Sequence, residues 1–406
     1  MSGRELLREA FRAIRAHALR SGLTLLGVII GVTTLVGVIS VIAGLNIFVR
    51  DRVLQLAPDV FIVTKLGIIT NRDDFFDALK RPDLDWHEYE RLARQLKRSE
   101  TVAAHASTTS AVKAGARRLP DVRVEGTTAE FGPMMRLDVV AGRYFTEAED
   151  RTAQAVAVVG WDIKEELFPQ RDPLGRTVLV GGVPYRIVGL LERQGQTLGQ
   201  NQDNRLLIPV QAYRRQFGLR GSLDIFLQAR GGLLGLETAV DEARAVLRAL
   251  RHTDFRAPDP FGVVTAEALQ RLWAQISAAA FIFTVLVAAV SLGIGGIVIM
   301  NIMLVAVAER TKEIGVRLAI GARKRDIRRQ FLLEAALLAV AGGLLGVVLG
   351  GLVAVGVRGV LGFPAEVTLP IVLVGLLLSA AVGVAAGYWP AYSASNLPVV
   401  DALRAE

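Results

Sequence analysis

The sequence predicts a membrane protein with four transmembrane α-helices and a large α+β extracytoplasmic domain between the first and second spans. Hydrophobic residues make up 52% of the 406 residues, and the mean hydropathy of +0.40 is high for a soluble protein. Four long windows contain no Asp, Glu, Lys, Arg or His, whereas residues 57–262 have an ordinary globular composition. The apolar excess is therefore concentrated in segments that can cross a membrane.

Each charge-free window is long enough for one span. A helix that crosses a hydrocarbon core of about 30 Å needs ~20 mostly apolar residues. We therefore expect four transmembrane helices, within residues 21–49, 272–308, 335–357 and 367–400.

The segment before the first span is predicted to be a cytoplasmic amphipathic helix, residues 1–20. Its apolar positions recur at 3–4 spacing: Leu7, Phe11, Ile14 and Ala18. A basic helix of this kind suits the membrane interface, although a solvated lead-in helix would show the same pattern. The charged segment is too long for the n-region of a cleaved signal peptide, so we expect an uncleaved first span with its N-terminus in the cytoplasm.

The net charge of +8 is distributed as expected for a membrane protein. Basic residues crowd the first twenty positions and residues 310–329, both directly beside spans, where Lys and Arg mark the cytoplasmic side. We expect membrane lipids as partners and exclude nucleic acid. Four spans then place the C-terminus in the cytoplasm as well.

The span order places residues 50–271 outside the cytoplasm, as a domain on a helical stalk. Two residues, Gly181 and Gly182, open a loop that predicts a β-hairpin. The expected strands are residues 60–63, 155–159, 177–180, 185–190 and 224–229, and the expected helices are 86–97, 162–168 and 236–250. The most linker-like stretches are residues 220–235 and 257–262.

Several kinds of chemistry are missing from the sequence. It contains no G-x-x-x-x-G-K-[ST], G-x-S-x-G or H-E-x-x-H motif and no cysteine, and its four histidines are scattered. The spans carry no ionisable side chain of the kind that ion-coupled transporters use. We therefore expect a non-catalytic chain, without a metal site or cofactor of its own, that is driven by a partner.

Glycines recur four residues apart in the predicted spans. This spacing lets helix backbones approach closely. Packing within the chain and packing in a dimer explain the pattern equally well. The glycines are Gly27, Gly31, Gly342, Gly346, Gly350, Gly383 and Gly387.

The segment E-R-T-K-E-I-G-V-R-L-A-I-G-A, residues 309–322, follows a predicted span directly. It resembles the cytoplasmic loop of MacB/FtsX-type ABC transporter permeases. The order of basic helix, single span, outer domain and three-span block is also that of the family. Three further segments, residues 142–146, 172–176 and 250–255, resemble recurrent parts of the MacB-like periplasmic core. The C-terminus differs, because Pro398 stands one place early and the usual basic residues are missing.

The resemblance implies that residues 309–322 form a coupling helix that docks on an ATPase subunit. Ile314 and Leu318 would form an apolar ridge, Gly315 would allow close approach, and Gly321 would end the helix. Glu313 and Arg317 can pair at i,i+4. Without the resemblance, these charges would only set membrane orientation. The residues implied are Glu309, Arg310, Thr311, Lys312, Glu313, Ile314, Gly315, Arg317, Leu318 and Gly321.

The resemblance also implies a function. The chain would be the permease subunit of an ABC transporter in the bacterial inner membrane, and a separate ATPase subunit would bind ATP and Mg²⁺. ATP hydrolysis would move the extracytoplasmic domain by mechanotransmission to export a substrate. The alternatives are an FtsX-like relay to a cell-wall hydrolase and a lipoprotein-extraction permease. Partners in the family include a second copy or a homologous permease, a periplasmic adaptor and an outer-membrane channel.

These inferences divide the chain into six parts. They are a cytoplasmic helix (1–20), a first span (21–49), an outer domain (50–271), a second span (272–308), a coupling helix with a basic loop (309–329), and two further spans with a short C-terminus (330–406).

Overall fold

The computed structural model describes residues 18–48, 57–69, 71–197, 200–219, 221–361, 365–399 and 402. Its contacts divide the chain into two compact units. We call Met1–Phe48 with Ile276–Glu406 the membrane domain, and Val49–Gln275 the outer domain. The predicted amphipathic helix, residues 1–20, lies outside the described residues except for its last three, which begin the first helix.

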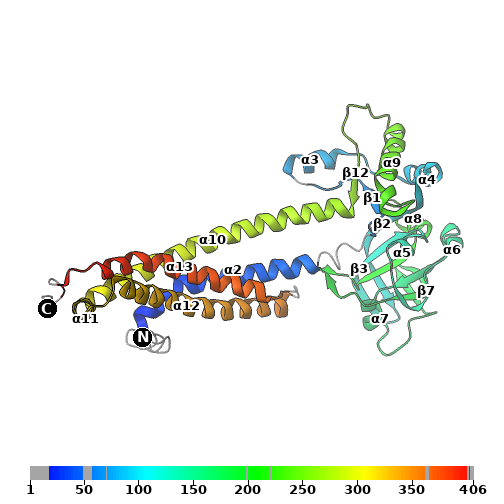
Figure 1. Ribbon diagram of the computed structural model, residues 1–406. Coiled ribbons are helices and arrows are strands. Elements are labelled where there is room, and N and C mark those ends of the chain that lie inside the picture. Colours follow the sequence, from blue (N-terminus) through cyan, green and yellow to red (C-terminus); the bar gives the residue numbers. More distant parts are fainter. Residues whose placement is uncertain are drawn as a thin grey trace. The chain divides into compact units, whose positions relative to one another are not determined.

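Among the described residues, four helices are long and apolar enough to cross a membrane, which confirms the four predicted spans. A fifth, short helix, α11 (Thr311–Ala319), lies between the second and third. The four are α2 (Ala18–Phe48), α10 (Ala266–Glu309), α12 (Lys324–Leu361) and α13 (Leu369–Ser395) (Figure 1). Residues 324–329 were expected in a basic loop, but they form the first turns of α12, because Lys and Arg are good helix formers.

A row of glycines on α12 packs against a row of valines on α2. A Cβ added at Gly346 would lie 2.8 Å from the Cβ of Val32, and one at Gly350 would lie 2.9 Å from that of Val36. Both rows advance by four residues in the same direction, so the two helices run parallel. The hydroxyl of Thr33 also donates to the carbonyl oxygen of Gly346, at 3.2 Å.

The other glycine contacts are also made within the chain. Gly27 meets Gly295 of α10, and Gly31 meets Leu292. On α13, a Cβ added at Gly383 or Gly387 would lie 2.5 Å from the Cβ of Ala339 or Ala335 respectively, both on α12. Gly342 lies against Leu25 and Val28. All seven glycines singled out in the sequence thus lie against another helix of the same chain.

The outer domain is built on one mixed sheet, in the order β12-β1-β11-β2-β3-β10-β5-β7-β4, with β6 paired to β2 and β7. Its strands are β1 (Val60–Thr64), β2 (Ser99–Ala114), β3 (Arg117–Thr127), β4 (Val139–Gly142), β5 (Val156–Val159), β6 (Thr177–Val180), β7 (Val183–Leu191), β10 (Arg205–Pro209), β11 (Asp224–Ala229) and β12 (Gly262–Thr265). A separate hairpin consists of β8 (Gln196–Thr197) and β9 (Gln200–Asn201).

Helices cover the two halves of this sheet separately (Figure 1). Leu92 of α4 and Leu247 of α9 belong to a core with β1 and β11, formed from both ends of the domain sequence. Ile163 of α7 and Tyr213 of α8 belong to a second core around β3, β5–β7 and β10. The helices are α3 (Arg72–Lys80), α4 (Trp86–Gln95), α5 (Phe131–Met134), α6 (Glu147–Arg151), α7 (Trp161–Leu167), α8 (Val210–Phe217), η2 (Gly232–Gly235) and α9 (Leu236–Leu250).

The predicted strands and helices of this domain are present, with small differences at their ends. Seven strands were not predicted: β2, β3, β4, β8, β9, β10 and β12. Strand β2 reads SETVAAHASTTSAVKA, in which Ser, Thr and Ala obscure the apolar alternation. Residues 220–235 were expected to be linker-like, but they include β11, which lies between β1 and β2 inside the sheet.

The segment at residues 142–146, which resembles a recurrent family segment, makes a tight corner between β4 and α6. Gly142 has φ of 79°, and a Cβ there would collide with the carbonyl oxygen of Val188. Arg143 forms a bidentate ion pair with Glu149, with both N–O distances 2.7 Å. Thr146 caps α6 in a capping box with the same Glu149. This segment has a structural role.

Arg251, in another of the resembling segments, joins α9 to α4. Its side chain is mostly buried and pairs with Glu88, with Nε–Oε1 2.5 Å and Nη2–Oε2 2.9 Å. It also donates to the carbonyl oxygens of Pro260 (2.6 Å) and Asp83 (3.1 Å). Bonds from one guanidinium to this many acceptors hold the loop after α9 against the domain.

A buried histidine links three neighbouring strands of the sheet. His105 of β2 lies 3.6 Å from a carboxylate oxygen of Glu125 on β3 and 3.6 Å from one of Asp224 on β11. Its ring stacks on Phe131 and meets Phe226 edge-on. Burial opposes protonation, but the two carboxylates outweigh it and raise the pKa of His105 to about 9.

The charge on His105 makes the stability of the sheet depend on pH. Because the folded pKa is raised above the unfolded value of about 6.5, this stabilisation is complete below that value and is lost as pH rises through about 9. We expect amide protection in β2 to fall over this range. In His105→Gln, the buried Glu125 loses its hydrogen-bonded cation and keeps only the longer-range charges of Arg205 and Arg123, which costs about 3 kcal/mol, and the pH dependence disappears. Hydrogen exchange at several pH values measures both effects; equal pH profiles for the two proteins would contradict this account.

The glycine contacts predict opposite effects at two positions. Gly383→Ala should destabilise the protein by about 2 kcal/mol, because the new methyl group overpacks against Ala339. Gly351→Ala, on α12, meets nothing within 4 Å and should stabilise the helix by about 0.5–1 kcal/mol. Thermal unfolding in detergent, followed by far-UV circular dichroism, tests this; the same change in Tm for both variants would refute it.

Candidate functional site

Helix α11 forms a sharp corner between two spans. It starts two residues after the end of α10, and the hydroxyl of Thr311 donates to the carbonyl oxygen of Val307, at 3.0 Å. At its end Gly321 has φ of 100°. The amide of Gly321 donates to Leu318, and that of Ala322 to Arg317, which is a Schellman motif. Gly321 therefore ends this helix, as the sequence predicts.

One face of α11 points into the membrane domain. Ile314 is 3% exposed and belongs to a core with Val307, Phe331 and Ala391, and Leu318 packs against this core. The ridge expected from these two residues therefore faces the chain's own interior and not a partner. The spacing of Ile314 and Leu318 predicts burial both against the chain's own interior and against a partner, so the sequence could not distinguish these two arrangements.

The close approach expected at Gly315 is made by the C-terminal segment of the same chain. A Cβ at Gly315 would lie 2.6 Å from the Cβ of Ala402, which is itself buried. The amide of Ala402 donates to the carbonyl oxygen of Pro398, at 3.0 Å. Asn396 accepts a hydrogen bond from Lys324, at 3.0 Å, beside the same corner.

Polar side chains fix α11 to α12. Arg317 donates to Gln330 of α12 at 2.8 Å and pairs with Glu313 at 2.5 Å, so the predicted i,i+4 pair is present. Arg310, at the junction of α10 and α11, lies 3.4 Å from Glu334 of α12, whose side chain is mostly buried. These arginines hold the corner together.

The opposite face of α11 is exposed and carries apolar side chains. Val316 is 42% exposed and Ile320 is 82% exposed. We call this surface the α11 outer face; it consists of Lys312, Glu313, Val316, Ala319 and Ile320, with Glu309 exposed just before it. The sequence reasoning missed Val316 and Ile320. Lys312, Val316 and Ile320 recur every four residues, which places them on one face of a helix, and this was the signal available in the sequence.

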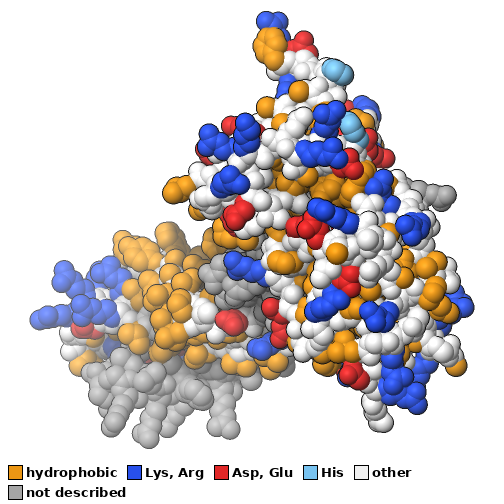
Figure 2. All heavy atoms as spheres, turned by 90° about the vertical axis from the view of Figure 1, so that its right-hand side faces the viewer, with side chains coloured by type: hydrophobic (Ala, Val, Ile, Leu, Met, Phe, Trp, Pro, Cys, Tyr) orange, Lys and Arg blue, Asp and Glu red, His pale blue; other side chains and the backbone are white. Residues whose placement is uncertain are grey.

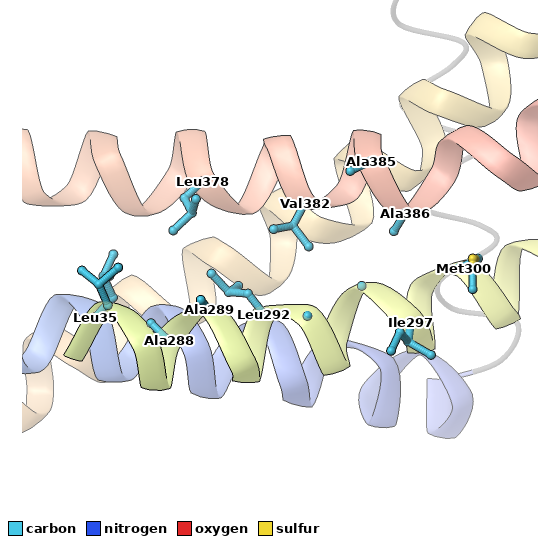
Figure 3. Close-up of a pocket in the computed structure, with 13 residues that line it drawn as sticks. Leu35, Ala288, Ala289, Leu292, Ile297, Met300, Leu378, Val382, Ala385 and Ala386 are labelled. Carbon is cyan, nitrogen blue, oxygen red and sulfur yellow. The ribbon is translucent and has the colours of Figure 1, made fainter. Parts of the chain in front are cut away.

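An apolar pocket lies between α10 and α13 in the membrane domain, with a volume of about 490 Å³ (Figure 3). Leu35 of α2, Leu292 and Met300 of α10, and Leu378 and Val382 of α13 are among its lining residues. The lining consists entirely of apolar side chains and glycine. It offers only van der Waals contact, so it can accommodate a hydrocarbon chain but supports no proton transfer or ion binding.

Charges of both signs are mixed over the face of the outer domain shown in Figure 2, which has no large surface of a single sign. Among the described residues, no group of three or more His, Asp or Glu side chains is placed to hold a metal ion. The arrangement at α11 suits the transmission of a contact.

Two protein families match the chain. The family described as MacB-like periplasmic core domain matches residues 21–249, and that described as FtsX-like permease C-terminal matches residues 285–399. The second match includes α11, α12 and α13.

Curated relatives match over the whole chain. The macrolide export ATP-binding/permease protein MacB of Bdellovibrio bacteriovorus is 31% identical over 408 residues, which cover 99% of this chain and 62% of the relative. The pyoverdine export ATP-binding/permease protein PvdT of Pseudomonas syringae pv. syringae is 32% identical over 416 residues, covering 99% and 59%. The chain thus spans about three fifths of the length of these relatives.

Solved structures resemble the outer domain. The periplasmic region of MacB from Actinobacillus actinomycetemcomitans has a TM-score of 0.45 at 15% identity, covering 55% of this chain and 96% of that one. The extracellular domain of the ABC-type transporter YknZ from Gram-positive bacteria has a TM-score of 0.41 at 17% identity, covering 51% and 100%. The family match over residues 21–249, the FtsX-like match after it and the four spans agree. The chain belongs to the MacB-like family of ABC transporter permeases with an FtsX-like C-terminal domain.

Proposed function

We propose that this chain is the permease subunit of an ABC exporter, and that it receives the force of ATP hydrolysis from a separate ATPase subunit at the α11 outer face. ATP and Mg²⁺ are bound by that partner, and this chain is non-catalytic. Movement of α11 passes to the spans and on to the outer domain, where it drives export. The MacB and PvdT relatives are named as exporters with ATP-binding and permease parts, which supports this proposal.

The proposal rests on the difference between the two faces of α11. Its inner face is fixed to α12 by Arg317 and to the membrane core by Ile314, whereas its outer face exposes Val316 and Ile320. A surface of this kind can bind a partner while the helix stays attached to three spans. A contact that displaces α11 must then displace those spans too, because packed interiors respond as solids.

The proposed orientation places α11 in the cytoplasm of a bacterial cell, at the inner membrane. Basic residues from Arg323 to Arg329 lie next to this corner, as the positive-inside rule requires. Tyr388, Trp389 and Tyr392 are exposed near the end of α13 that packs on α11, as expected for an aromatic belt at the membrane surface. The outer domain then lies in the periplasm. A second permease, a periplasmic adaptor and an outer-membrane channel are proposed partners.

The docking role predicts a loss of binding when charge is placed on the α11 outer face. Ile320→Asp should reduce co-purification of the ATPase subunit by about tenfold or more, because a charge is buried against the partner without a counter-ion. Co-purification from membranes in mild detergent measures this.

Leu234→Asp is the matched control, because Leu234 is 96% exposed but lies in the outer domain. It should leave ATPase binding unchanged. Full retention of the ATPase by Ile320→Asp, in a variant that inserts normally, would remove α11 as the docking site.

The contact between Gly315 and Ala402 predicts a separable coupling defect. Gly315→Ala should still bind the ATPase but show a reduced ATP-dependent change in hydrogen exchange of the outer domain, because the new methyl group displaces Ala402. The double variant Gly315→Ala with Ala402→Gly restores the space and should restore the response. A defect that the second substitution does not relieve would show that this contact is unimportant for coupling.

A further inference from the structure

The outer domain contains a pocket of about 360 Å³ between the α5 segment and the ends of three neighbouring strands, β1, β2 and β11. This volume is near the lower limit of sites that bind small ligands, so the pocket suits a small molecule or one end of a larger one. Polar and apolar side chains share its wall. Six of the lining residues are Asp59, Thr101, Glu130, Met134, Arg136 and Gln228.

The carboxylate of Asp59 is held in place just before β1. The side-chain amide of Gln228 on β11 donates to its Oδ2, at 3.0 Å, and the backbone amide of Ala229 donates to the carbonyl oxygen of Asp59, at 2.8 Å. The other carboxylate oxygen, Oδ1, accepts no hydrogen bond within the part of the chain that the structure describes. It is therefore available to a donor on a ligand.

Charges of opposite sign line this pocket without pairing. The carboxylates of Asp59 and Glu130 and the guanidinium of Arg136 all belong to the wall. Among the described residues, neither Glu130 nor Arg136 forms an ion pair or a side-chain hydrogen bond. Arg and carboxylate groups pair strongly when they meet. Because these do not, they remain available to the two ends of a ligand that carries both charges.

Arg136 occupies a backbone position that favours glycine. Its φ is 48°, and the amide of Leu137 donates to the carbonyl oxygen of Gly132, at 3.0 Å, where α5 ends. Glycine is the usual residue at such a helix end. A side chain kept at a strained position is an indication of function. Here that side chain is the guanidinium that lines the pocket.

We infer that this pocket binds a substrate that carries both an ammonium and a carboxylate group. The ammonium group lies against Asp59 and Glu130, and the carboxylate lies against Arg136. An apolar part of the ligand packs on Met134, which is buried. This inference rests on the proposed export function, and it names the class of substrate.

The charges of the wall select this class. A purely anionic ligand would face two carboxylates, and a purely cationic one would place a like charge beside Arg136. A ligand with both charges pairs with both kinds of group, through hydrogen bonds about twice as strong as neutral ones. A metal ion fits less well, because the described residues place no group of three Asp, Glu or His side chains together.

The pocket lies at the end of the sheet from which α10 begins. Strand β12 pairs with β1, with Thr265 opposite Phe61, and α10 starts at the next residue, Ala266. Gln228 lies opposite Val60 at this same end of β1. In the proposed function, movement of α10 therefore acts on strands that line the pocket. A movement that reshapes the pocket changes ligand affinity, and by reciprocity the ligand biases the movement.

A binding measurement tests the class of ligand. The probe is the dipeptide alanyl-leucine with both termini free, titrated into the full chain in detergent micelles and followed by ligand-observed NMR. Its N-acetyl form lacks the ammonium group, and its C-terminal amide form lacks the carboxylate. Each of these should bind about tenfold more weakly, because each loses a hydrogen bond between charged groups.

Two substitutions assign the ends of the ligand. Asp59→Asn keeps an acceptor for Gln228 but removes the charge, so it should weaken binding of the free dipeptide about tenfold and leave the N-acetyl form unaffected. Arg136→Gln should weaken the free dipeptide by a similar factor but not the amide form. Asp138→Asn is the matched control and should leave binding unchanged, because Asp138 is exposed nearby and does not line the pocket. Equal Tm values establish that the variants fold alike.

A second measurement tests whether the ligand is a substrate. Alanyl-leucine should raise the rate of ATP hydrolysis by the complex of this chain with its ATPase subunit, in nanodiscs that leave both faces accessible. Asp59→Asn should abolish this rise, whereas Asp138→Asn should retain it.

The outcomes separate this inference from the proposed function. Equal binding of all three probes, or equal losses in Asp59→Asn and Asp138→Asn, would overturn the pocket as the site and leave the ATPase contact, which Ile320→Asp tests, intact. Selective binding without a rise in ATP hydrolysis, in a complex that forms, would overturn the assignment of the ligand as a substrate. A chain that binds no ATPase would overturn the proposed function and that assignment together. Selective binding with a rise that Asp59→Asn abolishes supports the inference.

Discussion

Close approach of helix backbones at small residues is the constraint on which the membrane domain depends. In a bilayer the lipid chains are as apolar as the side chains, so burial alone does not select one helix contact over another. Contact geometry must select it. The valine row of α2, which includes Val32, fits over the glycine row of α12, and Ala335 and Ala339 occupy the space left by Gly387 and Gly383. These contacts fix which helices are neighbours and in which register.

The same packing continues into α11 and attaches that helix to the spans. Ile314 belongs to the core that also contains Val32 and Ala339, so the α11 corner and the contacts between the spans form one packed body. Arg317 and Arg310 add polar bonds at its edge. In the proposed docking role, a contact at Val316 and Ile320 would displace several spans because α11 is packed against them. A flexible loop would absorb that contact locally.

The outer domain shows how recurrent segments can be structural. Gly142 allows a turn that a Cβ would block, Arg143 and Thr146 share Glu149, and Arg251 joins two helices through Glu88. These residues hold corners, which explains why a resemblance in sequence appears there without any catalytic group. His105 adds a charged link between strands that belong to the two halves of the sheet.

The sequence by itself determined the four spans, the existence of the outer domain and the short helix between the second and third spans, because each depends on local composition, on charge next to a span, or on the residues 309–322. It did not determine β2, β3, β4, β8, β9, β10 and β12. Strand β2, which is rich in Ser, Thr and Ala, becomes a strand only when its neighbours pair with it. Nor did it determine which face of α11 is free. Ile314 and Ile320 are the same residue type in the same segment, yet one is 3% and the other 82% exposed. Only the tertiary structure decided between them, because burial depends on what packs nearby: here the membrane core and the returning C-terminal segment at Ala402.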